Sequence, residues 1–268
     1  MTLLCIIPQS VQAQKTKVPN LLLYDDQPYH FGFIIALNNM NYAFDYKSKY
    51  QNDLYGFLQQ NDLADQDPII INRVHESNFD TDTILFNTRS IEPNIRYGFT
   101  VGIVGNLRLG KYFDLRFIPS LSFGNKSINY TYNVIRSKYR NIIDWDFENA
   151  KITQATTSVF VTIIDLPIHI KYKSKRYNNI AAYIIAGGNP RFDLSPLWSD
   201  KKNLHNKIFD FAAEIGAGFD YYTGYFKMGI EAKFSFGLLD VLDKRNNQYD
   251  ASIEGLKNRM FQLSLTFE

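Results

Sequence analysis

Two alternating segments joined by a short turn occupy residues 96–123, RYGFTVGIVGNLRLGKYFDLRFIPSLSF. In the first segment one face carries Tyr97, Phe99, Val101, Ile103, Leu107 and Leu109, and the other carries Arg96, Thr100, Asn106 and Arg108. In the second segment Phe113, Leu115, Phe117, Leu121 and Phe123 oppose Asp114, Arg116, Ser120 and Ser122. A period of two residues places alternate side chains on opposite faces of a strand, so this stretch predicts a hairpin with one apolar and one polar face.

The same alternation recurs along the chain and predicts eight strands in total. They cover residues 30–42, 96–109, 113–123, 158–172, 180–188, 209–221, 226–236 and 260–267. The last strand is apolar at every second position from Phe261 to Phe267, a pattern typical of the terminal strand of outer-membrane barrels, although Glu268 follows the aromatic residue.

The composition excludes several classes of protein. The chain has 268 residues, 29 Lys and Arg against 27 Asp and Glu, one Cys, and 45% hydrophobic residues, which excludes a disulfide miniprotein, a disordered chain and a nucleic-acid-binding arm. The sequence has no apolar run of the about 20 residues that a membrane-spanning helix needs. Aromatic residues nevertheless make up 15% of the chain while its mean hydropathy is −0.25. A transmembrane β-barrel can have a high aromatic content together with a negative mean hydropathy, because its strands alternate apolar and polar residues.

The lengths of the connections favour a barrel over a soluble sandwich. Long connections at 43–94, 125–156, 189–206 and 238–258 alternate with shorter ones at 110–112, 173–179 and 222–225. Outer-membrane barrels have this pattern because their extracellular loops are long and their periplasmic turns are short. We therefore expect an all-β fold, an eight-stranded antiparallel up-and-down transmembrane β-barrel with both termini on the periplasmic side. A soluble ligand-binding barrel is the alternative and would purify without detergent.

The start of the chain has features of a signal peptide. Residues 2–7 are mostly apolar, and Val11-Gln12-Ala13 suits a signal-peptidase site, although the positive segment that should precede them is missing. We expect a signal peptide at 1–13 with a truncated start, a periplasmic segment at 14–28 and the barrel domain at 29–268. An ordinary N-terminal strand is the alternative.

The polar faces carry equal numbers of positive and negative charges. Charges enclosed in a barrel of eight strands should be paired, because an isolated buried charge is costly and the interior is only wide enough for side chains. We predict an ion-pair network inside the barrel formed by Arg96, Arg108, Asp114, Arg116, Asp165, Lys171, Asp210, Glu214, Asp220, Lys227, Glu231 and Lys233. The interior should then be filled rather than open.

The long stretch at 43–94 is unusual for a loop. A hairpin of Ile69–Val74 with Thr83–Asn87, and a short helix at Asn52–Gln60, are the structures that its sequence suggests. Its acidic residues Asp62, Asp65, Asp67, Asp80 and Asp82 lack the spacing of an EF-hand, so a solvated acidic loop is favoured over a calcium site.

No catalytic, cofactor-binding or metal-binding motif stands out. His30 and His169 should face the interior, where a structural role is favoured over metal binding or acid–base chemistry because a third partner is missing. His75 and His205 lie in connections with Ser77 and Ser195 nearby, which keeps a lipid-modifying enzyme as an alternative. The basic turn Lys173–Arg176 is expected to be exposed to solvent, and contact with lipid phosphate or a periplasmic partner is the alternative.

Two segments resemble a known family. Residues 99–124 (FTVGIVGNLRLGKYFDLRFIPSLSFG) and 165–188 (DLPIHIKYKSKRYNNIAAYIIAGG) are similar to the PorT family of outer-membrane barrels from the Bacteroidota, and the similarity spans 29–268. Membership implies a component of the type IX secretion system, which exports proteins across the outer membrane and serves gliding motility in some members. It implies no catalytic residues. The expected partners are outer-membrane lipid and other secretion-system proteins, with no nucleic acid and no cofactor.

Overall fold

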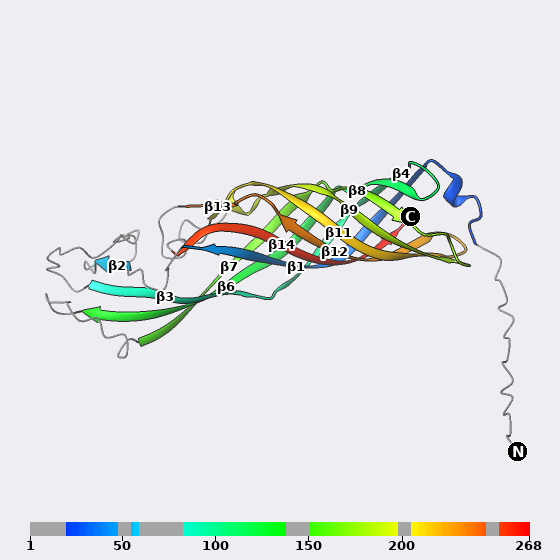
Figure 1. Cartoon of the computed structure of the whole chain (residues 1–268). Coiled ribbons are helices and arrows are strands. Elements are labelled where there is room, and N and C mark those ends of the chain that lie inside the picture. Colours follow the sequence, from blue (N-terminus) through cyan, green and yellow to red (C-terminus); the bar gives the residue numbers. More distant parts are fainter. Residues whose placement is uncertain (1–19, 48–54, 59–82, 138–150, 198–204, 245–251) are drawn as a thin grey trace, which may run out of the picture.

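The described part of the chain consists almost entirely of strands. The computed structural model describes residues 20–47, 55–58, 83–137, 151–197, 205–244 and 252–268 (Figure 1). Its elements are η1 (Tyr24–Asp26), β1 (Tyr29–Tyr46), β2 (Tyr55–Leu58), β3 (Thr83–Asn94), β4 (Tyr97–Arg108), β5 (Phe113–Phe117), β6 (Ser120–Ser137), β7 (Lys151–Asp165), β8 (Ile168–Lys173), β9 (Ile180–Asp193), η3 (Ser195–Leu197), β10 (His205–Asn206), β11 (Phe209–Tyr222), β12 (Lys227–Gly237), β13 (Leu242–Asp243) and β14 (Ile253–Phe267). None of the helices among these residues has the length and apolar character to cross a membrane. The all-β prediction is confirmed, whereas the expected signal peptide at 1–13 lies outside the described residues.

Eight strands pair into a closed ring. Its order is β1, β4, β5, β8, β9, β11, β12 and β14, and β14 pairs with β1. Every pair is antiparallel and the order follows the chain, so consecutive ring strands are neighbours. The register of β1 against β14 brings Phe33 opposite Phe267, which places the beginning of the first ring strand and the end of the last one at the same end of the ring. The connections 109–112, 174–179 and 223–226 lie at this end as well.

Two prolines divide ring strands into parts. Pro119 separates β5 from β6, and Pro167 separates β7 from β8. Proline has no N–H and interrupts a ladder in the middle of a sheet. Backbone bonds bridge both breaks, from Ile118 N to Pro167 O (3.2 Å) and from Ile103 N to Pro119 O (3.0 Å). Beyond the breaks β4 pairs with β6, and β9 pairs with β7. The ring is therefore closed at this level too, with β6 and β7 in the places of β5 and β8.

The strands extend further than the alternation predicts. The sheet has 12 strands because β2, β3, β6 and β7 belong to it in addition to the ring. Figure 1 shows β3, β6 and β7 continuing past the ring, away from the end where β14 finishes. The prediction of a helix at Asn52–Gln60 is wrong at Tyr55–Leu58, which form a strand paired with β3. Pairing with β3 outweighs the local preference for a helix that the Asn and Asp residues before it suggest. The hairpin half predicted at Ile69–Val74 lies outside the described residues.

Apolar side chains cover the outside of the ring and polar ones fill its inside. In β11, Phe211, Ile215 and Phe219 are exposed, whereas Asp210, Glu214 and Asp220, at positions of the opposite parity, are buried. The same inversion holds in β1, where Phe33, Ile35 and Leu37 are 54%, 44% and 63% exposed. A soluble protein buries such residues and rarely exposes an apolar surface of this extent. The outer surface of the ring is therefore suited to an apolar environment.

Candidate functional site: the charged interior

Charged side chains of both signs line the interior in nearly equal number. The buried cations among the described residues are Arg116, Lys126, Lys171, Lys173, Arg191, Lys227 and Lys233. The buried anions are Asp114, Asp165, Asp193, Asp210, Glu214, Asp220, Glu231 and the side chain of Glu268. Burying a charge without a partner costs several kcal/mol, so the near balance of seven cations against eight anions permits an interior of this composition.

Three close ion pairs occupy the part of the interior nearest the short turns. They join Arg116 to Glu231 (2.7 Å), Lys171 to Asp220 (2.6 Å) and Lys227 to Glu268 (2.7 Å). Two of these cations lie near the ring of Tyr183, with its centroid 3.7 Å from Lys171 Nζ and 5.9 Å from Arg116 Cζ. A cation over an aromatic face is stabilised by the ring quadrupole, so Tyr183 joins two of the pairs in one packed unit.

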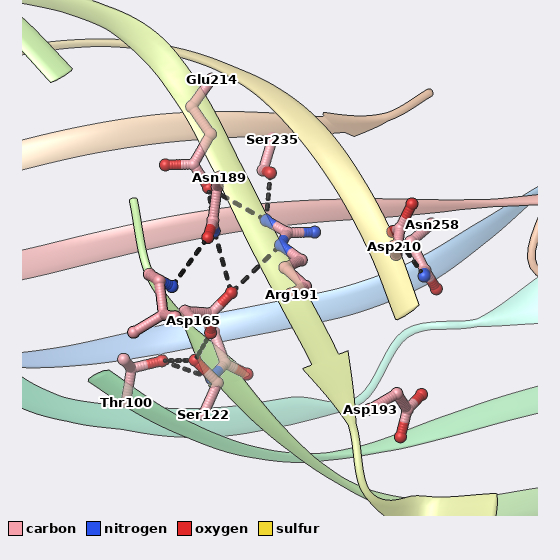
Figure 2. A network of polar contacts seen from close by, with 12 residues as sticks. Thr100, Ser122, Asp165, Asn189, Arg191, Asp193, Asp210, Glu214, Ser235 and Asn258 are labelled. Carbon is pink, nitrogen blue, oxygen red and sulfur yellow. Dashed lines mark hydrogen bonds and ion pairs between the residues drawn. The ribbon is translucent and has the colours of Figure 1, made fainter. Parts of the chain in front are cut away.

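Glu214 is the centre of the middle part of the interior. Its carboxylate lies 2.7 Å from His169 Nε2, 2.8 Å from Lys233 Nζ, 3.0 Å from Arg191 Nη2 and 2.8 Å from Asn189 Nδ2. Arg191 also contacts Asp165 at 3.0 Å and donates to Ser235, as Figure 2 shows. These groups come from four strands of the ring, β8, β9, β11 and β12, and from β7, so the cluster connects neighbouring strands across the interior.

A chain of hydrogen bonds continues from this cluster to β1. Ser122 Oγ donates to Asp165 Oδ2 at 2.6 Å, and the Ser122 and Thr100 hydroxyls are 2.9 Å apart (Figure 2). Asn38 Nδ2 then donates to Thr100 Oγ1 at 2.9 Å. The polar contacts therefore reach from β11 to the opposite side of the ring.

The third part of the interior lies nearer the long connections. Lys126 Nζ donates to Asn258 Oδ1 at 2.6 Å and lies 4.5 Å from the centroid of Tyr42. Asn258 Nδ2 in turn donates to Asp210 Oδ2 at 2.8 Å. A cluster of buried apolar residues packs around Tyr42 and comprises Ile91, Ile128, Tyr130, Tyr132, Val241, Leu242, Ile253 and Leu256. This cluster closes the polar interior on that side.

The segment Asn20–Pro28 covers the opposite end. The ring of Tyr24 stacks on His30 with centroids 4.0 Å apart, and burial raises the pKa of Tyr24. Asp25 accepts a hydrogen bond from the Tyr222 hydroxyl at 2.8 Å and lies 3.8 Å from Lys173 Nζ. The interior is thus covered by side chains at both ends.

Ten of the twelve residues predicted for the network are buried in the interior. They are Asp114, Arg116, Asp165, Lys171, Asp210, Glu214, Asp220, Lys227, Glu231 and Lys233. Arg96 is exposed instead, because it lies in the break between β3 and β4 where the alternation is interrupted. Arg108 is at the rim, where it pairs with Asp26 at 3.1 Å rather than with an interior group.

Four interior residues lie outside the predicted strands. Lys126, Arg191 and Asp193 lie in segments that the alternation predicts as connections, and Glu268 follows the last predicted strand. Each of them continues the inward parity of its strand, so extending the alternation past the apolar residues would have found them. Lys173 and Arg176 of the basic turn are also engaged, with Asp114 (3.1 Å) and with the Tyr222 ring (3.9 Å from its centroid) respectively.

The arrangement offers no assembled catalytic or metal centre within the described residues. No group of three or more His, Cys, Asp or Glu side chains among them could hold a metal ion. Ser195 is buried and donates its hydroxyl hydrogen to Asp193 Oδ1 at 2.5 Å. His75, Ser77 and the acidic residues between Asp62 and Asp82 lie outside the described residues. What the geometry provides is an interior held together by ion pairs.

Comparison with known proteins places this geometry in a family. A family model described as "Outer membrane protein beta-barrel domain" matches residues 63–243, more than half of the chain. The outer membrane protein OprG from Pseudomonas aeruginosa is a similar solved structure, with 10% sequence identity, a TM-score of 0.40, and coverage of 90% of this chain and 94% of that chain. No curated protein matches the chain. The chain belongs to the outer membrane protein beta-barrel domain family, and its location is the cell outer membrane.

Proposed function

We propose that this barrel is a non-catalytic accessory component of type IX protein secretion, with a role in gliding motility in organisms that glide. The resemblance of residues 99–124 and 165–188 to the PorT family supports the assignment to that system. The ring described above is then the transmembrane part, with its exposed apolar side chains in contact with lipid.

The short turns face the periplasm in this proposal, and the long connections face the outside of the cell. Outer-membrane barrels have short periplasmic turns and longer extracellular loops. The turns at 109–112, 174–179 and 223–226 lie at the same end of the ring as Tyr29 and Phe267. The segment Asn20–Pro28 then lies on the periplasmic side.

The filled interior is the observation that carries the accessory role. Ion pairs occupy the ring from Lys227 near one end to Lys126 near the other, and each end is covered by side chains. A ring of eight strands has an interior about wide enough for its own side chains. A folded cargo protein cannot pass through it, so the contribution to export has to come from contacts of the loops and turns with other secretion-system proteins.

Deletion of the gene in a strain that secretes by this system tests the proposal. We expect cargo proteins to accumulate in the periplasm, and secretion to return when the wild-type chain is supplied. The abundance of unrelated outer-membrane barrels serves as the control for general envelope damage. Normal secretion in the deletion strain would leave an outer-membrane barrel without a secretion role.

A further inference from the structure

The outer face of the ring has a groove that crosses β8, β9, β11 and β12. Its volume is about 520 Å³, and the described residues that line it are all uncharged. Ala217 lies opposite Ala232 and Ile184 in the neighbouring ladders, and Ala186 lies opposite Ile215. The two isoleucines are more than half exposed, so the groove is a row of small residues bordered by large apolar ones on the face that lies against lipid.

One end of the groove reaches the side of the ring with the short turns. Tyr172 lines the groove and is the last outward residue of β8 before the turn 174–179. Its ring lies beside Phe113, with centroids 5.2 Å apart, and beside Tyr112, with centroids 6.4 Å apart. Aromatic side chains collect at the level of the lipid headgroups in membrane proteins. This end of the groove is therefore suited to the surface of the membrane.

Two exposed lysines lie beside this end of the groove. Lys111 Nζ is 5.7 Å from the centroid of the Tyr112 ring, and Lys175 follows Tyr172 by three residues. The backbone bond from Lys173 N to Tyr112 O (2.9 Å) holds the two turns together. Both ammonium groups are therefore at the end of the groove that reaches the turns.

These lysines are not neutralised by the acidic residues near them. Asp25 and Asp114 face Lys173 instead, at 3.8 Å and 3.1 Å from its Nζ. In the part of the chain that the structure describes, neither Lys111 nor Lys175 forms an ion pair. Two positive charges are left at the rim, and lysine is a common ligand of phosphate groups.

We propose that the groove and the two lysines form a binding site for an anionic glycerophospholipid. One acyl chain lies along the alanines of the groove, and the headgroup phosphate binds the ammonium groups of Lys111 and Lys175. In the groove the acyl chain has side chains on two sides, so it makes more dispersion contacts than a chain against a smooth surface. The phosphate gains charge-assisted hydrogen bonds at the edge of a medium of low dielectric constant.

A second copy of this chain fits the groove less well than a lipid. Two barrels in one membrane have the same orientation, so contact through this groove brings the lysines of both copies to the same level. Like charges repel there, because no acidic residue of the described chain pairs with Lys111 or Lys175.

The lipid site does not depend on the secretion role. It rests on the outer face of the ring and on its turns, whereas only the leaflet follows from the orientation proposed above, which places the headgroup on the periplasmic side. Normal secretion in a deletion strain would leave the lipid site in place, and absence of lipid binding would leave the secretion role in place.

Competition between two lipids provides the test. The full-length protein is placed in micelles that contain equal amounts of phosphatidylglycerol and phosphatidylcholine with the same acyl chains. Native mass spectrometry then counts the molecules of each lipid that stay bound. We expect the wild-type protein to retain phosphatidylglycerol with a preference of about fivefold or more, since a single basic residue near a lipid surface contributes about this factor.

Substitution of the lysines tests the headgroup contact. Lys111→Gln combined with Lys175→Gln should abolish the preference for phosphatidylglycerol. Lys207→Gln combined with Lys244→Gln is the matched control, because these two exposed lysines lie on the side of the long connections. This control removes the same charge from the protein and should keep the preference.

Substitution of an alanine tests the groove. Ala217→Phe fills part of the groove, and displacing two methylene groups of the acyl chain from it should lower the binding of phosphatidylglycerol about tenfold. Ala213→Phe is the matched control, because Ala213 is on the outward side of the same strand and does not line the groove. All variants must first show the heat-dependent gel migration of a folded barrel.

The outcomes decide the proposal. Preferential retention of phosphatidylglycerol that is lost with the two rim lysines and weakened by Ala217→Phe supports it. Equal retention of both lipids by the wild-type protein, a preference that survives loss of Lys111 and Lys175, or equal binding to Ala217→Phe and Ala213→Phe would each overturn it. A dimer without bound lipid that disappears in Ala217→Phe would assign the groove to a second copy and equally overturn it.

Discussion

Glu214 is the residue on which the cations of the interior converge. Its two carboxylate oxygens face Lys233, Arg191 and His169 within 3.0 Å, and its side chain is inaccessible to solvent. Buried charges of this kind do not simply add stability, because the cost of desolvation offsets much of their attraction. Each member of the cluster therefore depends on the others, because removing one leaves an uncompensated charge at a position closed to solvent.

Neutralising Glu214 should therefore be strongly destabilising. Glu214→Gln keeps the shape of the side chain but leaves Lys233 and Arg191 without their common partner, and we expect a loss of about 3–5 kcal/mol in the free energy of unfolding. The measurement is the urea midpoint of the folded band in detergent gels. Glu254→Gln, at an exposed position of β14, is the control and should change the midpoint little. Equal midpoints for the two variants would show that the interior charges are not coupled.

A double-mutant cycle on Arg116 and Glu231 tests the same principle at a single pair. These side chains are 2.7 Å apart, and both are at most 1% exposed. Arg116→Met and Glu231→Leu should each cost about 3–5 kcal/mol alone, whereas the double variant should cost less than the sum because no lone charge remains. Strict additivity in unfolding experiments would mean that the two groups do not interact.

Among the strands, the alternation of apolar and polar residues predicts most of the ring. It fails where the alternation itself is interrupted. Every ring strand overlaps a predicted segment, because apolar residues at every second position have a single physical explanation in a half-exposed strand. The extensions were not predictable in this way. In β6 the inward positions 128, 130 and 132 are Ile and Tyr, which reverses the polarity of the two faces beyond the ring. Arg96 shows the opposite case. Its position in the alternation predicts an inward side chain, but it lies in the break between β3 and β4 and is exposed.

Close contact between β8 and β9 requires glycine at position 187. A Cβ there would lie 2.0 Å from the Ile168 carbonyl oxygen, which is backbone and cannot move aside easily. Gly187→Ala should thus separate the two strands and destabilise the barrel by about 1–3 kcal/mol. Gly105→Ala is the matched control, since the nearest atom to its Cβ would be 3.5 Å away. Thermal unfolding of the two variants compares them, and an equally stable Gly187→Ala protein would argue against the tight pairing.

The segment that covers the short-turn end depends on Asp25. The Asp25 carboxylate accepts a hydrogen bond from the Tyr222 hydroxyl and lies near Lys173 Nζ. Asp26, in contrast, forms an ion pair with Arg108 at an exposed position. Asp25→Asn should increase amide hydrogen exchange in residues 20–28 without unfolding the ring. Asp26→Asn should have a smaller effect, because an exposed ion pair contributes only about 0–1 kcal/mol. Identical exchange in both variants would contradict the importance of the inner contact.

At the scale of the whole molecule, the outward and inward faces of one ring have opposite chemistry. The exposed apolar residues suit the membrane in which the family resides, and the charges that such a surface excludes are gathered inside in nearly balanced number. Since side chains fill the ring and cover both ends, the parts that remain for contact with partners are the loops and the turns. The accessory role that we propose follows from this division.

Closure of the ring by its first and last strands is the central claim, and disulfide formation between them in the outer membrane tests it most directly. Leu37 lies opposite Leu263 in the register of β1 and β14. Such positions are about 4.5–5.5 Å apart between Cα atoms, within the range of a disulfide. In a Cys5→Ser background, Leu37→Cys with Leu263→Cys should form an intramolecular disulfide upon oxidation in intact membranes, detected as altered migration of the denatured monomer. Leu37→Cys with Ile184→Cys, on the strand across the ring, should not. Failure of the first pair to link within one chain, or equal linking of both pairs, would contradict the closed ring.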